Sequence, residues 1–356
     1  MMSFRNGYLQ KQAWPNHILQ LISRIQEYKG KQDLYRRQLP EILDGLRQAA
    51  IIQSVESSNR LEGIVVSGKR IPLIVKEKAA PKNRSESEVA GYRDVLEMIH
   101  ESAPYMNLST GLVLQMHGVL MRYVTEAGGR WKSVDNYIKE TLPSGEERIR
   151  FVPVPAWQTP DAMQELVTCY KEEIDKGYVN DLILIAAFVL DFLSIHPFSD
   201  GNGRMARLLT LLLLYQSGYE VGRYISLEKI VEDSKEQYYD TLYRSSIHWH
   251  QGQHDIKPWL EYFLNVVLKA YQRLEERIGN VETPRRGWKK EHVKQIIMRL
   301  PDTFTYADVA ERCPGISHST ISRVLNELGK QGFIACIERG PGARYVKTPT
   351  LQRTSL

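Results

Sequence analysis

The sequence predicts a mainly α-helical protein that carries one β-hairpin and ends in a separate, smaller domain. Three observations support this fold class. Two apolar runs, residues 182–190 and 208–214, flank a short polar segment and are typical of buried helices. Two β-prone runs on either side of residues 143–145 (Pro-Ser-Gly), a turn signal, indicate a hairpin. A break in composition at residues 280–287 separates a basic C-terminal part from the rest.

Helical periodicity dominates the first 63 residues. Apolar residues recur at helical spacing near the N-terminus, at Trp14, Ile18, Leu19, Ile22 and Ile25. Residues 29–37 are basic but interleaved with other residues, which favours a solvated helix end or a loop. A second helical pattern starts near residue 40 and includes Ile42, Leu43, Leu46, Ala49, Ala50 and Ile51. Gly63 is expected to stop this helix.

The polar segment, residues 196–207 (His-Pro-Phe-Ser-Asp-Gly-Asn-Gly-Arg-Met-Ala-Arg), is the most informative part of the chain. Backbone N–H groups in a Gly-Asn-Gly turn can converge on an anion, and a helix that begins there adds its dipole. Arg204 and Arg207 share a helix face and suit phosphate oxygens. Asp200 can hold Mg²⁺ together with phosphates, and His196 can accept a proton. A lone histidine or Gly-x-Gly is usually structural, but converging polar groups indicate a site.

This segment resembles the signature of Fic-domain proteins at every fixed position, and a looser resemblance covers residues 40–275. It implies a helical core that transfers a nucleoside monophosphate, usually AMP from ATP, to a protein hydroxyl. The resemblance assigns His196 as general base and Asp200 as the Mg²⁺ ligand. It assigns phosphate binding to Gly201, Asn202, Gly203, Arg204 and Arg207.

The resemblance extends to three flanking features, each with a structural alternative. Ser58, Glu62 and Gly63 resemble the family's inhibitory motif, in which Glu62 would pair with Arg207 in the γ-phosphate position; otherwise they are ordinary helix-end residues. The hairpin resembles the family's flap, which aligns a target by strand addition; otherwise it is a surface hairpin. Tyr238 and Tyr239 resemble residues that line the nucleotide pocket, or else they pack in the core. The flap residues are Tyr137, Ile138, Ile149 and Phe151. Trp259 and Phe263 are predicted to be core residues.

The C-terminal part has its own pattern. From residue 285 onward, 13 Lys/Arg and 6 Asp/Glu give +7, whereas the preceding part carries 5 − 7 = −2. Helical spacing at residues 291–300, 305–311 and 317–328, the last after Ser317 as N-cap, precedes two short strands at 333–338 and 343–347. This order resembles winged helix-turn-helix modules, so residues 285–356 are predicted either to bind DNA or to dock a protein partner. Arg339 and Arg344 would lie on the wing. The residues predicted to face outward from the third helix are His318, Ser319, Ser322, Arg323 and Asn326.

The sequence thus predicts residues 1–105 as a helical region with the inhibitory helix at about 40–63, 106–280 as the catalytic core and 285–356 as the winged module. Three scattered cysteines and an N-terminus without a signal layout indicate a cytoplasmic protein, and no apolar run predicts a membrane span. The predicted function is an autoinhibited protein adenylyltransferase that uses ATP and Mg²⁺. The alternatives are a DNA-binding regulator that senses nucleotide and an enzyme that removes AMP. The target protein, which could be the chain itself, and a homodimer stay open.

Overall fold

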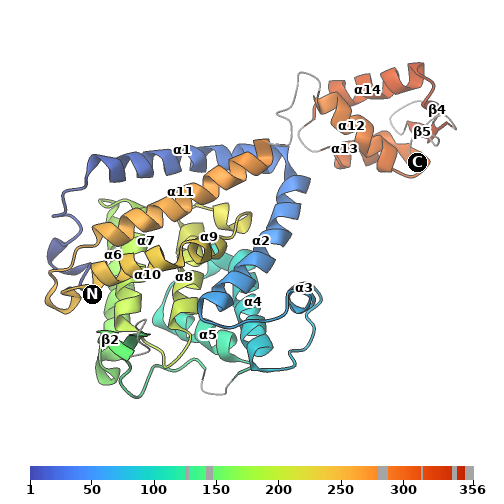
Figure 1. Ribbon diagram of the computed structural model, residues 1–356. Coiled ribbons are helices and arrows are strands. Elements are labelled where there is room, and N and C mark those ends of the chain that lie inside the picture. The colour runs from blue at the N-terminus through green and yellow to red at the C-terminus, as the bar shows by residue number, and fades with distance from the viewer. Residues whose placement is uncertain (125–127, 142–146, 280–287, 314–315, 339–342, 349–356) are drawn as a thin grey trace. The chain divides into compact units, whose positions relative to one another are not determined.

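A computed structural model describes residues 1–124, 128–141, 147–279, 288–313, 316–338 and 343–348 (Figure 1). The chain forms two compact units. Unit 1 comprises residues 1–33 and 41–275, and unit 2 comprises residues 34–40 and 276–356. The turn predicted at 143–145, the segment 280–287 and Arg339 lie outside the described residues.

Unit 1 is a helical assembly, as the sequence predicts. Its helices are α1 (Asn16–Gln38), α2 (Pro40–Leu61), α3 (Arg70–Lys76), α4 (Arg84–Ser102), α5 (Thr110–Met121), α6 (Thr159–Lys176), α7 (Asp181–Ile195), α8 (Asn202–Gln216), α9 (Leu227–Asp233), α10 (Lys235–Ser246) and α11 (Lys257–Gly279). Side chains 182–190 of α7 are at most 3% exposed, which matches a helix that is apolar on every side. Helix α8 is also surrounded by other helices (Figure 1), so the loop between α7 and α8 starts and ends in the core.

The first two helices follow the predicted pattern. Helix α2 starts at Pro40 and ends at Leu61, and Gly63 follows with φ 78°, a left-handed conformation that favours glycine. Helix α1 extends to Gln38, so residues 29–37 form its C-terminal end, one of the two predicted alternatives. Its inner face explains the extension: Tyr28 stacks on Tyr271 of α11, and the buried Gln32 accepts a hydrogen bond from the Tyr271 hydroxyl.

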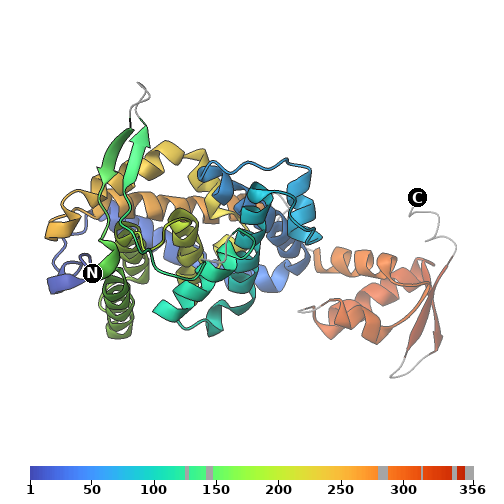
Figure 2. The ribbon, with the colours of Figure 1, turned by 90° about the horizontal axis from the view of Figure 1, so that it is seen from below.

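The predicted hairpin is present and projects from the helices (Figure 2). Strand β1 (Ile138–Thr141) pairs antiparallel with β2 (Glu147–Phe151), with an irregularity in register after Ile138. Phe151 faces the helices, where its ring stacks on His250 at 5.4 Å between centroids. Ile149 is 52% exposed, so one face of the hairpin lies open.

Unit 2 combines helices α12 (Trp288–Arg299), α13 (Tyr306–Glu311) and α14 (His318–Lys330) with a small sheet. Its strands β3 (Thr303–Thr305), β4 (Ile334–Glu338) and β5 (Arg344–Lys347) are antiparallel in the order β3-β5-β4. The sequence analysis missed β3, because three residues are too few for a periodic signal. Thr305 caps α13 reciprocally with Asp308, whereas the predicted cap Ser317 bonds hydroxyl groups of its own helix rather than a backbone N–H.

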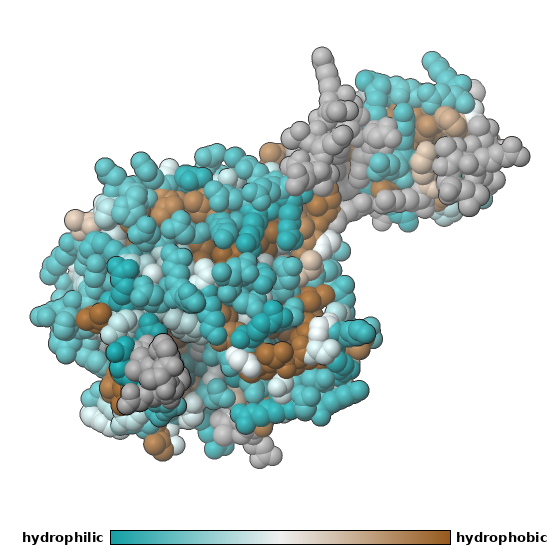
Figure 3. Space-filling view, in the orientation of Figure 1, coloured by the Kyte–Doolittle hydropathy of each residue, from teal (hydrophilic) through white to brown (hydrophobic). Residues whose placement is uncertain are grey.

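The surface of unit 1 in Figure 3 is largely hydrophilic, with scattered apolar patches. Among the described residues, no helix combines the length and apolar character that crossing a membrane requires.

Candidate functional site

The site is built on the loop that joins two buried helices. Helix α7 ends at Ile195, and His196 follows in a left-handed conformation with φ 50°. Helix α8 begins at Asn202 after Gly201, whose φ of 81° favours glycine. The Asn202 amide closes the loop, since it accepts from Phe198 N at 2.9 Å and donates to Phe198 O at 2.7 Å. The Asn202 side chain therefore holds the loop that leads into the predicted phosphate turn.

His196 has the protonation state of a base. Its Nδ1 lies 3.3 Å from the Leu193 carbonyl oxygen, which can only accept, so Nδ1 carries the proton and Nε2 has a free lone pair. Burial lowers the pKa of His196 to about 4. At neutral pH the imidazole is therefore uncharged and able to take a proton.

A pocket of about 730 Å³ opens at this loop, within the size range of small-molecule sites. Five regions of the chain line it: the end of α2 with Glu62, the hairpin, the end of α7, the loop with the start of α8, and α10. The lining residues named in the sequence analysis are Glu62, Ile138, Phe151, His196, Asp200, Gly201, Asn202, Gly203, Arg207, Tyr238 and Tyr239. Of the other hairpin residues, Tyr137 precedes β1 and is 51% exposed, and Ile149 lines a neighbouring surface depression.

Arg207 makes three hydrogen bonds to residues at the end of α2. Arg207 Nε donates to Ser58 Oγ at 2.8 Å, and Nη2 donates to Ser58 O at 2.9 Å and to Glu62 Oε1 at 2.7 Å. Burial alone would lower the pKa of Arg207, but the Glu62 carboxylate raises it above its ordinary value, so the guanidinium stays charged. Arg207 Nη1 is buried and has no hydrogen-bond partner among the described residues.

Glu62 lies directly over the turn. An added Cβ on Gly203 would lie 2.2 Å from Glu62 Oε1 and 3.3 Å from Arg207 Nη1. No side chain fits there while Glu62 holds this position, so glycine at 203 permits the close approach. The Glu62 carboxylate thus lies next to both Gly203 and the Arg207 guanidinium.

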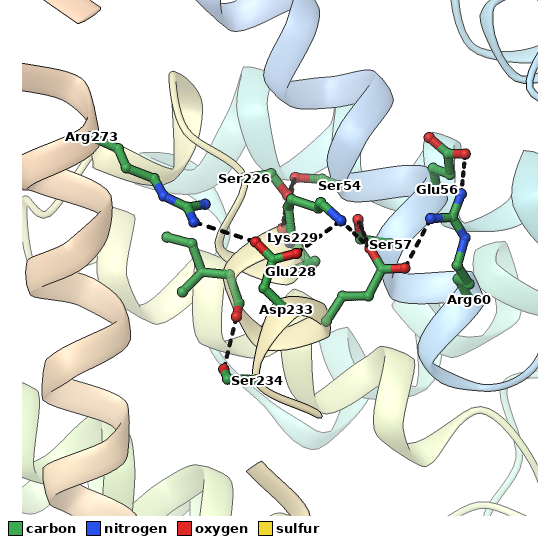
Figure 4. Close-up of polar contacts among 12 residues, drawn as sticks. Ser54, Glu56, Ser57, Arg60, Ser226, Glu228, Lys229, Asp233, Ser234 and Arg273 are labelled. Atoms are coloured by element: carbon green, nitrogen blue, oxygen red, sulfur yellow. Dashed lines mark hydrogen bonds and ion pairs between the residues drawn. The ribbon is translucent and has the colours of Figure 1, made fainter. Parts of the chain in front are cut away.

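Polar contacts to α9 hold the C-terminal part of α2, which carries Ser58 and leads to Glu62 (Figure 4). The buried Ser54 donates to Glu228 Oε2 at 2.7 Å, and Ser57 donates to Glu232 Oε2 at 2.8 Å. Arg60 Nη1 also donates to Glu232, at 2.9 Å. These bonds, together with the fully buried Ser58, make the end of α2 a part of the core of unit 1.

Arg204 is placed differently from Arg207. It is 1% exposed and does not line the pocket; its Nη1 lies 2.8 Å from Glu88 Oε2 on α4, and its Nη2 lies 3.6 Å from Asp200 Oδ1. Asp200 itself is 53% exposed at the pocket, so one carboxylate is accessible there for a cation. The two arginines that the sequence analysis grouped together thus have separate surroundings.

Tyr238 and Tyr239 of α10 line this pocket. Tyr238 is 4% exposed and packs against Tyr262 and Trp259, whereas the Tyr239 hydroxyl lies 3.4 Å from the Leu61 carbonyl oxygen, which accepts its hydrogen bond. Trp259 and Phe263 are buried, which confirms that they belong to the core. Tyr238 is therefore both a core residue and a wall of the pocket.

Lys132, Asn136 and His117 bind the loop without lining the pocket, and the sequence did not indicate them. Lys132 is 3% exposed, and its Nζ donates to Asn136 Oδ1 at 2.8 Å and to Ile195 O at 3.0 Å. Burial lowers the pKa of Lys132 to about 8. His117 stacks on Phe198 at 3.7 Å between ring centroids, and burial lowers its pKa to about 4. In the sequence only His117 stands out, as a polar residue in a largely apolar helix, whereas Lys132 and Asn136 lie in a polar stretch.

Comparison with known proteins agrees with this picture. Residues 107–214 match the model of the Fic/DOC family. The protein adenylyltransferase Fic of Culex quinquefasciatus is 24% identical over 230 residues, covering 61% of this chain and 41% of that protein. A ribonucleoside-diphosphate reductase small chain of Ostreid herpesvirus 1 is 33% identical over 132 residues, but these are only 22% of that protein. This chain therefore spans less than half the length of these curated relatives.

The fold itself matches solved structures. A Fic family protein from Desulfovibrio desulfuricans G20 superimposes with a TM-score of 0.62 at 22% identity, covering 95% of this chain and 98% of that chain. At this identity the match supports the fold alone. Residues 107–214, which contain the loop and most of α8, are thus the part of the chain that matches the Fic/DOC family.

Proposed function

We propose that this protein is a protein adenylyltransferase whose Glu62 inhibits it. The supporting observation is the arrangement of His196, the 201–203 turn and Arg207 in one pocket, with Glu62 Oε1 bound to Arg207 at 2.7 Å. The relatives named protein adenylyltransferase support the same activity class.

In the proposed reaction His196 Nε2 takes the proton of a Ser, Thr or Tyr hydroxyl on a target protein. The hydroxyl oxygen forms a bond to the α-phosphorus of ATP, the bond from that phosphorus to the bridging oxygen breaks, and pyrophosphate leaves. The N–H groups at the start of α8 and Nη1 of Arg207 would bind phosphate oxygens. Asp200 would hold Mg²⁺ together with the phosphates, since Mg²⁺ commonly takes one or two carboxylates, and the ion would neutralise phosphate charge. The target segment would add as a further strand to an edge of the two-stranded β1–β2 hairpin.

Inhibition follows from competition for Arg207. While Glu62 occupies the space beside Nη1, the distal phosphate cannot take the position in which the α-phosphate faces His196. Because α2 is anchored by Ser54 and Ser57, we propose that release requires the Glu62 side chain to rotate, not α2 to detach. Glu62 is 30% exposed, so its side chain has room to move.

The test compares Glu62→Ala with Glu56→Ala in the full chain, incubated with α-labelled ATP and a cell lysate. Glu56 is the matched control, because it lies on the same helix, is also 30% exposed and pairs with Arg60. Glu62→Ala should raise labelling about tenfold or more, since about 1.4 kcal/mol of competition corresponds to that factor. Glu56→Ala should not change it, and adding His196→Ala should abolish it. Equal labelling by both glutamate variants would reject the inhibitory role.

Unit 2 supports a second candidate function, binding of duplex DNA. On α14, Ile321, Val324, Leu325 and Leu328 are buried, whereas His318, Ser319, Arg323 and Asn326 are exposed and Ser322 is partly exposed. One face of this helix therefore presents polar and basic groups, as a recognition helix does. A gel shift with random duplex should show retention that weakens with salt and with Arg323→Ala. Retention of no duplex at low salt would remove this function.

A further inference from the structure

The carbonyl oxygens of the 195–200 loop face a set of donors on the side opposite the pocket. Lys132 provides two donors, with its Nζ 3.0 Å from Ile195 O and its backbone N 2.9 Å from Pro197 O. Asn136 Nδ2 donates to His196 O at 3.3 Å and to Phe198 O at 2.9 Å. Five of the six consecutive carbonyls are bonded in this way when the contact of His117 with Asp200 is included.

His117 completes the set with a defined tautomer. Gly129 N donates to His117 Nδ1 at 3.0 Å, so Nδ1 is unprotonated and Nε2–H donates to Asp200 O at 3.1 Å. In a trans peptide the N–H points opposite to the C=O. The bond to Asp200 O therefore directs the Gly201 N–H the other way, where it donates to Asp200 Oδ1 at 2.6 Å. His117 thus orients the Asp200 carboxylate through the backbone.

The same geometry applies at the other carbonyls. The bond from Asn136 to Phe198 O turns the next N–H, that of Ser199, away from Asn136. Bonds to Ile195 O and His196 O hold the backbone on both sides of the His196 Cα, which is in a left-handed conformation that only a restrained loop keeps. The segment 129–136 leads directly into β1, so the donors and the hairpin are parts of one continuous stretch of chain.

We infer that His117, Lys132 and Asn136 are positioning residues that set the geometry of His196 and Asp200 by binding the loop carbonyls from behind. None of the three lines the pocket, so they act through the loop. For its kinetic readout, this inference rests on the proposed adenylyltransferase function.

The experiment uses the full chain with Glu62→Ala as the active parent and adds Asn136→Asp. The new carboxylate has the same shape as the amide, but it replaces a donor with an acceptor that repels two carbonyls. Asn265→Asp is the control, because Asn265 Nδ2 also donates to a backbone carbonyl, that of Glu261, on an exposed helix face. We expect Asn136→Asp to lower kcat roughly 10- to 100-fold with less change in KM for ATP, as misplacement of reacting groups does. We also expect faster hydrogen exchange of the amides of residues 196–203, with neither effect in the control.

Two outcomes overturn the inference: unchanged kcat in an active parent, or unchanged exchange of the loop amides. If Asn136→Asp does not fold, Asn136→Ala replaces it in both measurements, because this change removes the donor without adding charge. If the Glu62→Ala parent itself transfers no label, the proposed function fails. The exchange measurement on the same proteins still decides whether Asn136 holds the loop.

Discussion

Two arginines one helical turn apart on α8 have different surroundings in this structure. Arg204 and Arg207 are 1% and 6% exposed, and each has a glutamate within 2.8 Å. The partner of Arg204, Glu88, is 8% exposed and lies inside the helical core, whereas the partner of Arg207, Glu62, is 30% exposed and lines the pocket. The Arg204–Glu88 pair is thus closed to solvent, whereas the Arg207–Glu62 pair can separate because Glu62 is partly exposed.

The difference shows that burial of the arginine alone does not define a phosphate ligand. Both guanidinium groups are desolvated and have buried nitrogens without a hydrogen bond among the described residues, but only Arg207 lines the pocket and pairs with a partly exposed glutamate. Arg204 is placed to hold Asp200 through Nη2, so we propose that it supports the cation site rather than the distal phosphates. Three changes test this comparison.

Glu88→Ala should have the largest effect on stability. It leaves the guanidinium of Arg204 buried without its carboxylate, which costs roughly 3–5 kcal/mol for a buried pair. Glu62→Ala should cost only about 1 kcal/mol, because its pair is partly exposed and Arg207 keeps Ser58 as a partner. Urea unfolding followed by tryptophan fluorescence measures this in unit 1, which contains five of the six tryptophans. Equal losses would show that the two pairs do not differ.

Ser58→Ala should have an intermediate effect. It removes the Oγ acceptor of a buried, charged donor, at a cost of about 1.5–3 kcal/mol. Ser57→Ala is the neighbouring control, because Ser57 also bonds a charged group but on α9. We expect similar losses of stability from both changes. Labelling with ATP should rise only in Ser58→Ala, because Ser58, unlike Ser57, bonds Arg207. Raised labelling in both would indicate that loosening α2 anywhere is sufficient.

Much of unit 1 could be predicted from the sequence, because local patterns specify it. The apolar runs around residues 196–207 placed the loop between two buried helices. The pattern that starts at residue 40 predicted α2 over nearly its full length. The pairing of Glu62 with Arg207, expected from family resemblance, is present in the structure as a contact.

What could not be predicted depends on contacts between distant segments. Nothing local distinguishes Glu88 from other helical glutamates, so its pairing with Arg204 required the packing of α4 against α8. The same holds for Lys132 and Asn136, which reach the loop only after the hairpin segment folds back. In unit 2, β3 is three residues long and exists because β5 pairs with it.

The smallest predicted effect concerns Gly203 and tests directly whether Glu62 covers the turn. Gly203→Ala would place a methyl group 2.2 Å from Glu62 Oε1, so one of the two must move. In the Glu62→Ala chain this conflict is absent, and the same substitution should cost about 1 kcal/mol less, a coupling typical of residues in contact. Gly201→Ala is the control: its strain comes from φ 81° and from Leu120 at 3.3 Å, so its cost should be the same in both chains. The helix propensity of alanine cancels in each cycle, which leaves only the contact with Glu62. If Gly203→Ala costs the same in both chains, Glu62 does not lie over the turn in solution, and Arg207 is then no more blocked than Arg204.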